Sequence, residues 1–177
     1  MKMSHALTAA GATAVLSFGA TAAYAHPGPS GVPFKSAGTG TETSLSVSDC
    51  QNIGTHDCTV ESTGTAISSH MGTGPYVSDL TVHWATAYTN GAGGYCARAD
   101  GTGTITAANG DTLTQSDSGT VCEVGATGTH VPHTFNGTFT NTGGTGRFAT
   151  ASGSGTVTGG DDGYGNSNYQ ETGTISY

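Results

Sequence analysis

The sequence predicts an all-β protein that folds as a single closed barrel of eight antiparallel strands. Three observations support this class. The 177 residues include 30 glycines but carry charge at only 9% of positions, which separates the chain from charge-rich disordered proteins. Stretches of alternating apolar and polar residues recur, most clearly from Ser78 to Trp84, and no apolar stripe of helical period follows residue 25. Short runs of Asn, Gly and Asp between these stretches have the composition of tight turns.

Eight segments have the composition of strands. In chain order they are 34–47, 58–68, 76–88, 95–107, 111–122, 133–141, 146–157 and 170–177. An open antiparallel sheet of this size would leave two unpaired edges, and closure into a barrel removes them. The all-β alternative is a solenoid with Thr-x-Thr faces. Thr-Gly-Thr triplets do recur, but at irregular spacing, whereas a solenoid needs a fixed repeat.

The hairpin between the fourth and fifth segments predicts a disulfide. If Asn109-Gly110 forms a two-residue loop, Cys96 and Cys122 miss direct opposition by one residue. A three-residue loop or a single bulge corrects the register. We therefore expect Cys96 and Cys122 to be joined across the two strands.

The remaining cysteines and the histidines predict no metal site. Four cysteines allow three connectivities, and the one favoured here joins Cys50 to Cys58 across a short loop. The cysteine spacings do not suit zinc. The pair His130 and His133 would lie on opposite faces of a strand, so we expect loop histidines rather than joint ligands.

The segment 144–149 has the spelling G-x-G-x-x-A of a dinucleotide-binding loop. Such a loop needs a helix after it to hold the phosphate, and the small polar residues that follow have no helical stripe. We instead expect Gly143-Gly144 to form a two-residue primed turn. This register places Phe139 opposite Phe148, with Phe135 on the same face.

The N-terminal segment predicts export. Residues 1–25 have a positive start, an uncharged run of small and apolar residues, and the A-x-A cleavage site Ala23-Tyr24-Ala25. We therefore expect a secreted, extracellular protein cleaved after Ala25. A flexible leader at 26–33 would precede the barrel domain at 34–177.

The charge balance excludes two classes of partner. Beyond the signal, Lys35, Arg98 and Arg147 stand against 12 Asp and Glu residues. Nucleic acid and anionic membranes both need clusters of Lys and Arg, so neither is expected as a partner. An apolar small molecule and a second copy of the chain, bound through the outer faces of the barrel, stay open as partners.

Several motifs resemble one family. The segment Gly143-Gly144-Thr145-Gly146-Arg147-Phe148 resembles the GGTGRF segment of dirigent proteins and of the allene-oxide-cyclase-like barrel superfamily. Exported bacterial members of unassigned function are similar over more of the chain. Residues 63–72 resemble their G-T-A-x-H-L-G segment, 104–113 resemble a T-x-T-A-A-N-G-D-x-L hairpin, and 172–177 fit as a last strand.

This resemblance covers most of residues 60–177 and implies an eight-stranded antiparallel barrel. Relatives with known roles bind an apolar small molecule in the barrel and steer its cyclisation or coupling without a cofactor. Their polar catalytic residues lie outside the matched motifs, so the resemblance transfers no catalytic residue to this chain. The segment with Cys50 and Cys58 has no counterpart in it.

Strand alternation leaves the candidate site residues in two arrangements. If Leu80, Val82 and Trp84 line the interior, His83 faces solvent; if the order reverses, Asp79 and His83 become interior groups available for acid–base chemistry. Glu61 and Arg147 have the same ambiguity. The catalytic candidates are thus His83, Asp79, Glu61 and Arg147. The expected ligand-binding residues are Trp84, Leu80, Val82, Phe135, Phe139 and Phe148.

Three functions fit these features. The leading hypothesis is an exported barrel that binds a small apolar ligand without transforming it. The second is a cofactor-free cyclase or isomerase of the allene oxide cyclase or dirigent type. The third is a structural or surface-interaction protein whose barrel is filled by its own side chains.

Overall fold

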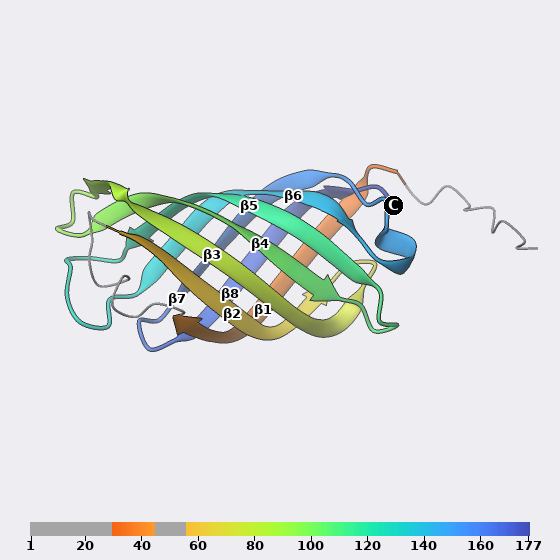
Figure 1. Ribbon diagram of the computed structural model, residues 1–177, viewed down its shortest axis with the longest axis horizontal. Coiled ribbons are helices and arrows are strands. Elements are labelled where there is room, and N and C mark those ends of the chain that lie inside the picture. The colour runs from red at the N-terminus through yellow and green to blue at the C-terminus, as the bar shows by residue number, and fades with distance from the viewer. Residues whose placement is uncertain (1–29, 45–55) are drawn as a thin grey trace, which may run out of the picture.

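The computed structural model describes residues 30–44 and 56–177, and within them the chain forms one closed barrel of eight antiparallel strands (Figure 1). Consecutive strands pair with one another, and β1 closes the barrel by pairing with β8. The predicted fold class, strand number and closure are confirmed. The predicted signal peptide, the first part of the leader and Cys50 lie outside the described residues. In the described ranges, no helix is long and apolar enough to cross a bilayer.

The strands fall close to the predicted segments. In order they are β1 (Val32–Ser44), β2 (Asp57–Ser68), β3 (Gly72–Thr89), β4 (Tyr95–Thr106), β5 (Thr112–Glu123), β6 (His133–Gly144), β7 (Ser154–Asp161) and β8 (Asn166–Ile175). A short 3₁₀ helix, η1 (Gly146–Phe148), lies between β6 and β7. The largest difference is that β7 begins at Ser154, well after the predicted Gly146; β3 and β8 each begin before the predicted position, at Gly72 and Asn166.

Side chains alternate between the two faces of the barrel wall along most of each strand. In β1, Phe34 and Ser36 are buried, whereas Lys35 and Ala37 are exposed. The Thr-Gly-Thr triplets at 39–41, 63–65, 102–104 and 172–174 obey the same rule, since each central glycine shares the inward face and the flanking threonines share the outward one. The triplets therefore belong to barrel strands rather than to a solenoid.

Inward glycines make room for aromatic side chains. Gly40 pairs with Gly64 across β1 and β2. A Cβ at either position would overlap a carbonyl oxygen of the neighbouring strand and the side chain of Tyr76. The ring of Tyr169 lies in the same way against Gly38. Glycine is required here because backbone and aromatic ring approach more closely than a side chain allows.

The β4–β5 turn is the three-residue loop that the cysteine register favours. The Ala107 N–H donates to the carbonyl oxygen of Asp111 at 2.7 Å, and Gly110 has a φ of 90°. Cys96 consequently lies directly opposite Cys122. The two form the predicted disulfide.

The disulfide stands on the outer face of the barrel, since the adjacent Ala97 and Val121 are buried inside it. Cys58 is also buried, and it is not a free thiol. Its predicted partner, Cys50, lies outside the described residues. The pairing of these two cysteines stays a prediction.

The predicted two-residue turn at Gly143-Gly144 is wrong. β6 continues through both glycines, and Gly144 pairs with Leu113 of β5. Phe139 lies opposite Gly155 rather than Phe148. Phe148 instead belongs to η1 and has no exposed surface. Folding this segment over the barrel end removes apolar surface from water, which a tight turn would leave exposed.

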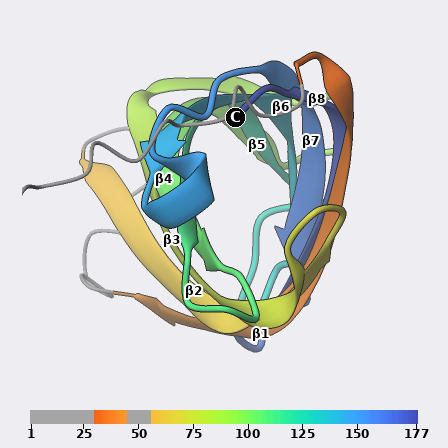
Figure 2. The ribbon, with the colours of Figure 1, turned by 90° about the vertical axis from the view of Figure 1, so that its right-hand side faces the viewer.

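The end of the barrel that carries η1 is filled by apolar side chains, and we term it the plugged end. It holds the start of β1, the β4–β5 hairpin and the end of β8, and Figure 2 shows η1 lying against it. The Phe34 and Phe139 rings contact one another with centroids 5.6 Å apart. The largest fully buried side chains are Phe34, Leu113, Phe139, Phe148 and Ile175.

Candidate functional site

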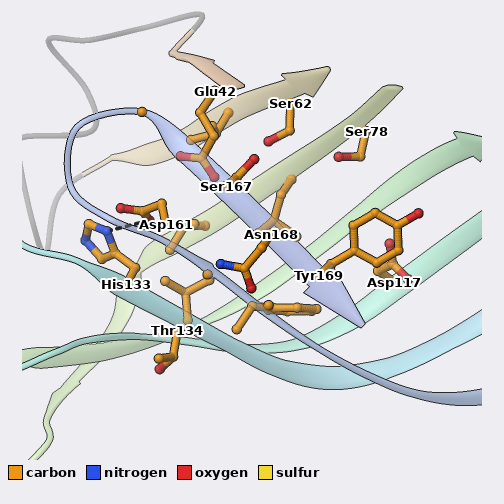
Figure 3. A pocket seen from close by; sticks show the side chains of 18 of the residues that line it. Glu42, Ser62, Ser78, Asp117, His133, Thr134, Asp161, Ser167, Asn168 and Tyr169 are labelled. Carbon is orange, nitrogen blue, oxygen red and sulfur yellow. Dashed lines mark hydrogen bonds and ion pairs between the residues drawn. The ribbon is translucent and has the colours of Figure 1, made fainter. Parts of the chain in front are cut away.

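The opposite half of the barrel encloses a cavity of about 720 Å³ (Figure 3). We term this half the cavity end; it holds the end of β1, the start of β2, the β5–β6 loop and the β7–β8 turn. All eight strands contribute to the wall. Small inward residues keep the space open: a Cβ on Gly103 would make only ordinary contacts with Ser78 and Asp117. The volume falls within the range of about 300–1,000 Å³ that is typical of small-molecule pockets.

One part of the wall is apolar. Four of the expected ligand-binding residues line it: Leu80, Val82, Trp84 and Phe135. The first three come from β3 and share its inward face, which resolves the alternation that the sequence left open. The other two, Phe139 and Phe148, lie in the plugged end with 0% exposure and do not line the cavity.

A polar group lies deeper in the cavity. The Gln115 side-chain N–H donates to Asn141 Oδ1 at 3.2 Å and to Glu171 Oε2 at 3.3 Å, and all three side chains are buried. Burial raises the pKa of Glu171 to about 8, and the nearby carboxylate of Asp117 raises it further. The hydrogen bond from Gln115 acts in the opposite direction and lowers it. Burial also raises the pKa of Asp117 to about 6. At neutral pH, Glu171 is therefore mostly a neutral acid.

Tyrosines and serines extend this polar wall. The hydroxyl of Tyr169 lies 3.0 Å from Ser36 Oγ, which in turn lies 2.8 Å from Ser68 Oγ. The Tyr169 ring contacts the edge of Tyr76, with centroids 5.1 Å apart. Burial raises the pKa of Tyr169 above its ordinary value. This hydroxyl therefore stays protonated and acts as a hydrogen-bond donor or acceptor.

A second acidic group lies nearer the loops. Figure 3 shows His133 and Asp161 on one side of the cavity, and Tyr169 and Asp117 on the other. The His133 Nδ1 and Asp161 Oδ2 atoms are 2.9 Å apart. Burial opposes protonation of His133, but its pKa is raised because the hydrogen bond and charge of Asp161 prevail. Burial, followed by the charge of Asp161, raises the pKa of Glu42 to about 7.

The loops at this end are tied to one another. The His130 ring stacks on Tyr164 with centroids 4.7 Å apart, and its Nδ1 lies 3.0 Å from the carbonyl oxygen of Gly163. His130 has a φ of 55°, an uncommon value for a residue with a side chain. The β5–β6 loop is thus fastened to the β7–β8 turn. His130 and His133 have separate partners, and only His130 lies in the loop, because His133 is the first residue of β6.

Three buried polar atoms of the cavity wall have no hydrogen-bond partner among the residues that the structure describes. They are Trp84 Nε1, Asp117 Oδ1 and Ser167 Oγ. Buried polar atoms are rarely left unpaired in folded proteins. One donor, one acceptor and one hydroxyl are therefore available to a molecule inside the barrel.

Three of the catalytic candidates lie on the outer face. His83 uses both ring nitrogens there: Nδ1 lies 2.9 Å from Asp57 and Nε2 lies 2.6 Å from Asp100. Hydrogen bonds to Asp100 and then Asp57 raise its pKa. Asp79 is exposed and lies opposite Glu61 on the neighbouring strand. Both point outward, because the residues next to them in each strand point into the barrel. None of the three side chains lies with the polar groups of the cavity.

Arg147, the fourth candidate, lies at the plugged end. Its guanidinium donates to the carbonyl oxygen of His70 and lies over the Phe148 ring, 4.8 Å from the centroid. Its backbone N–H donates to Asp111 at 3.3 Å. Arg147 thus fastens η1 to the β2–β3 turn and the β4–β5 hairpin, outside the barrel interior.

The described residues contain no group of three or more His, Cys, Asp or Glu side chains arranged to hold a metal ion. The polar residues of the cavity were not among the sequence candidates. Strand parity could have found them. Asp117 lies on the same face of β5 as Leu113 and Val121, and Glu171 lies on the same face of β8 as Ile175.

Comparisons with models of protein families, with curated proteins and with solved structures give no match to this chain. The barrel that the resemblance implies is present. Membership of the family stays a prediction.

Proposed function

We propose that this protein is an exported barrel that binds a small, largely apolar molecule in its cavity. The observation that carries the proposal is the cavity of about 720 Å³ with an apolar wall and a few unpaired polar atoms. Pockets that bind small molecules combine a mostly apolar lining with a few polar groups in fixed positions. Export is part of the proposal because residues 1–25 have the pattern of a secretory signal.

Two further points support ligand binding. The resemblance to dirigent and allene-oxide-cyclase-like barrels implies an apolar small molecule inside the barrel. The plugged end alone supplies a closely packed core, so the remaining interior is not needed for one. A structural protein with a filled barrel would have no reason to keep three unpaired polar atoms beside an empty space.

The direct test is to identify what the folded protein retains. The exported protein would be purified without denaturation, extracted with organic solvent and examined by mass spectrometry. We expect a small molecule in stoichiometric amount. An extract that contains none, from protein that also fails to bind any apolar probe, would contradict the proposal.

A cavity-filling variant sharpens this test. Gly103→Phe should abolish ligand retention, because the new ring would enter the cavity where a Cβ meets only ordinary contacts. The matched control is Thr102→Phe, which places the same ring on the exposed face of the same strand. The control should retain ligand as the unaltered protein does.

The runner-up is a cofactor-free cyclase or isomerase, and one observation favours it. With a pKa of about 8, Glu171 can donate a proton at neutral pH, and Asp117 can accept one nearby. The two candidates differ in turnover. If the extracted molecule is converted by the protein, and Glu171→Gln stops the conversion without preventing binding, the enzyme is favoured over the simple binder.

A further inference from the structure

We infer that the cavity selects ligands that carry a protonated amine, held at Asp117 and Glu171 while the apolar part lies along the wall with Trp84. This inference rests on the proposed function and names the chemical class of its ligand. It follows from the charges inside the barrel, from the atoms left unpaired there and from the cost of burying a carboxylate.

The ionisable groups of the cavity are strongly biased toward acids. The inward carboxyl side chains are Glu42, Asp117, Glu123, Asp161 and Glu171. Lys35, Arg98 and Arg147 are exposed, and within the described residues no lysine or arginine lines the cavity. The described part of the chain therefore supplies no permanent cation to the carboxyls at the centre.

Unpaired atoms point independently to an occupant. Trp84 is only 4% exposed, yet its indole N–H has no acceptor. Asp117 Oδ1 is buried with no donor. An ammonium group has three N–H donors and no acceptor, so it can satisfy the carboxylate oxygen. The aromatic face of Trp84 also attracts cations.

The two carboxyls at the centre of the cavity should favour a positively charged ligand over a neutral or negatively charged one. Asp117 and Glu171 are held toward their neutral forms because burial removes water without supplying an opposite charge. An ammonium nearby would favour both charged forms and gain two charge-assisted contacts. An alcohol gains neither, and a ligand carboxylate would be repelled.

Other titratable groups do not supply the missing positive charge. The groups that face the centre from neighbouring strands are the phenols of Tyr76 and Tyr169, and burial raises the pKa of Tyr169. Nearer the loops, the described histidines that line the cavity are His130, which stacks on Tyr164, and His133, which is already paired with Asp161 at 2.9 Å. Glu42 and Glu123 are further carboxyl side chains there. The path into the cavity therefore favours cations as well.

Three probes of equal chain length test the inference: n-octylamine, 1-octanol and octanoate. Trp84 is the chain's only tryptophan and lines the cavity, so its emission reports binding directly. Calorimetry gives a second readout. At pH 8.5 we expect octylamine to bind at least tenfold more tightly than octanol, and octanoate to bind most weakly. At pH 5.5 the octylamine preference should disappear, because both carboxyls are then largely protonated, whereas octanol affinity should not change.

Conservative variants separate charge from shape. Asp117→Asn with Glu171→Gln should remove at least tenfold of the octylamine affinity at pH 8.5 and leave octanol affinity within about twofold. Retained octanol binding shows that the variant is folded and hollow. Glu61→Gln is the matched control, since it makes the same change on the outer face, and it should keep the full preference.

The outcomes distinguish the two proposals. If octanol binds as tightly as octylamine, or if the double variant keeps the preference, the amine inference is overturned while the cavity still binds small molecules. If octanoate binds most tightly, the inference is likewise overturned. If none of the three probes binds, the proposed function fails and the inference fails with it.

Discussion

At the plugged end of the barrel Phe34, Phe139 and Phe148 have no exposed surface, whereas in the cavity end Phe135 and Trp84 border an open volume of about 720 Å³. The same strands run through both halves, so the difference lies in the side chains. At the plugged end, inward positions carry large apolar groups. In the cavity end, glycine, serine and acids share the inward positions with the apolar wall that contains Trp84 and Phe135.

The two halves are consequently held together in different ways. Packed rings and aliphatic chains stabilise the plugged end. Around the cavity, the disulfide Cys96–Cys122 and the histidine pairs with Asp57, Asp100 and Asp161 link neighbouring strands. This division lets the barrel keep an unfilled interior, because its stability does not depend on filling it.

Removing one ring from each half should expose the difference most strongly. Phe139→Ala should lower the free energy of unfolding by about 3–5 kcal/mol, because it leaves a hole in a packed core. Phe135→Ala should cost at least about 1 kcal/mol less, because that side chain already borders empty space. Urea denaturation of both variants measures this. Equal losses would contradict the division into a packed and a hollow half.

Removing the disulfide should lower the free energy of unfolding by somewhat less than Phe139→Ala does. The cysteines are separated by 26 residues, and for a loop of this length the double variant Cys96→Ala with Cys122→Ala should cost about 3 kcal/mol. Because the disulfide and Phe139 lie in different halves, the two losses should add within about 0.5 kcal/mol. A loss below about 1 kcal/mol would show that packing, not the crosslink, holds this half.

The cavity acid should make stability fall with rising pH. Unfolded Glu171 ionises near 4.5, whereas in the barrel its pKa is about 8. Between these values the folded state binds the extra proton, so stability declines as pH rises and levels off above about 8. At about 1.4 kcal/mol per pKa unit, Glu171→Gln should be more stable than the unaltered protein by over about 2 kcal/mol at pH 8. Unfolding curves of both proteins at pH 5 and pH 8 test this. If the stabilities of the variant and the unaltered protein change equally with pH, the prediction is contradicted.

The ion pairs of His83 should have the smallest effect. Its raised pKa means that their contribution is complete below pH 6.5 and is lost as pH rises through the folded pKa. Because the partners are exposed, His83→Gln should cost about 0.5–1 kcal/mol at pH 6 and almost nothing at pH 9. Thermal unfolding at the two pH values gives the comparison. A larger loss of stability at pH 9 than at pH 6 would contradict the predicted direction of the pH dependence.

The sequence predicts those parts of the fold that local chemistry decides. The hairpin at Asn109-Gly110 and the Cys96–Cys122 disulfide follow from turn residues and from counting along two adjacent strands. The segment after Gly143-Gly144 obeys a distant constraint instead. Phe148 must be buried at the barrel end, and this contact with residues far along the chain overrides the turn preference of the glycines.

The site was less accessible to sequence reasoning. The alternation that ends at Trp84 identified two possible inward faces of this strand, and the structure places Leu80, Val82 and Trp84 on the inward one. Asp117 and Glu171 were missed because a single carboxyl in a strand usually faces solvent. The two side chains lie near one another only once the barrel has closed. Their raised pKa values come from burial by other strands, which no local pattern reports.

The pairing of β1 with β8 joins strands at opposite ends of the described chain, whereas every other pair of neighbours is consecutive in sequence. Consecutive hairpins close short loops and can form early, but this seam closes nearly the longest loop the chain offers. We therefore expect it to form last in folding. Until it does, β1 and β8 are unpaired edges, and the same two strands could meet their counterparts in another molecule.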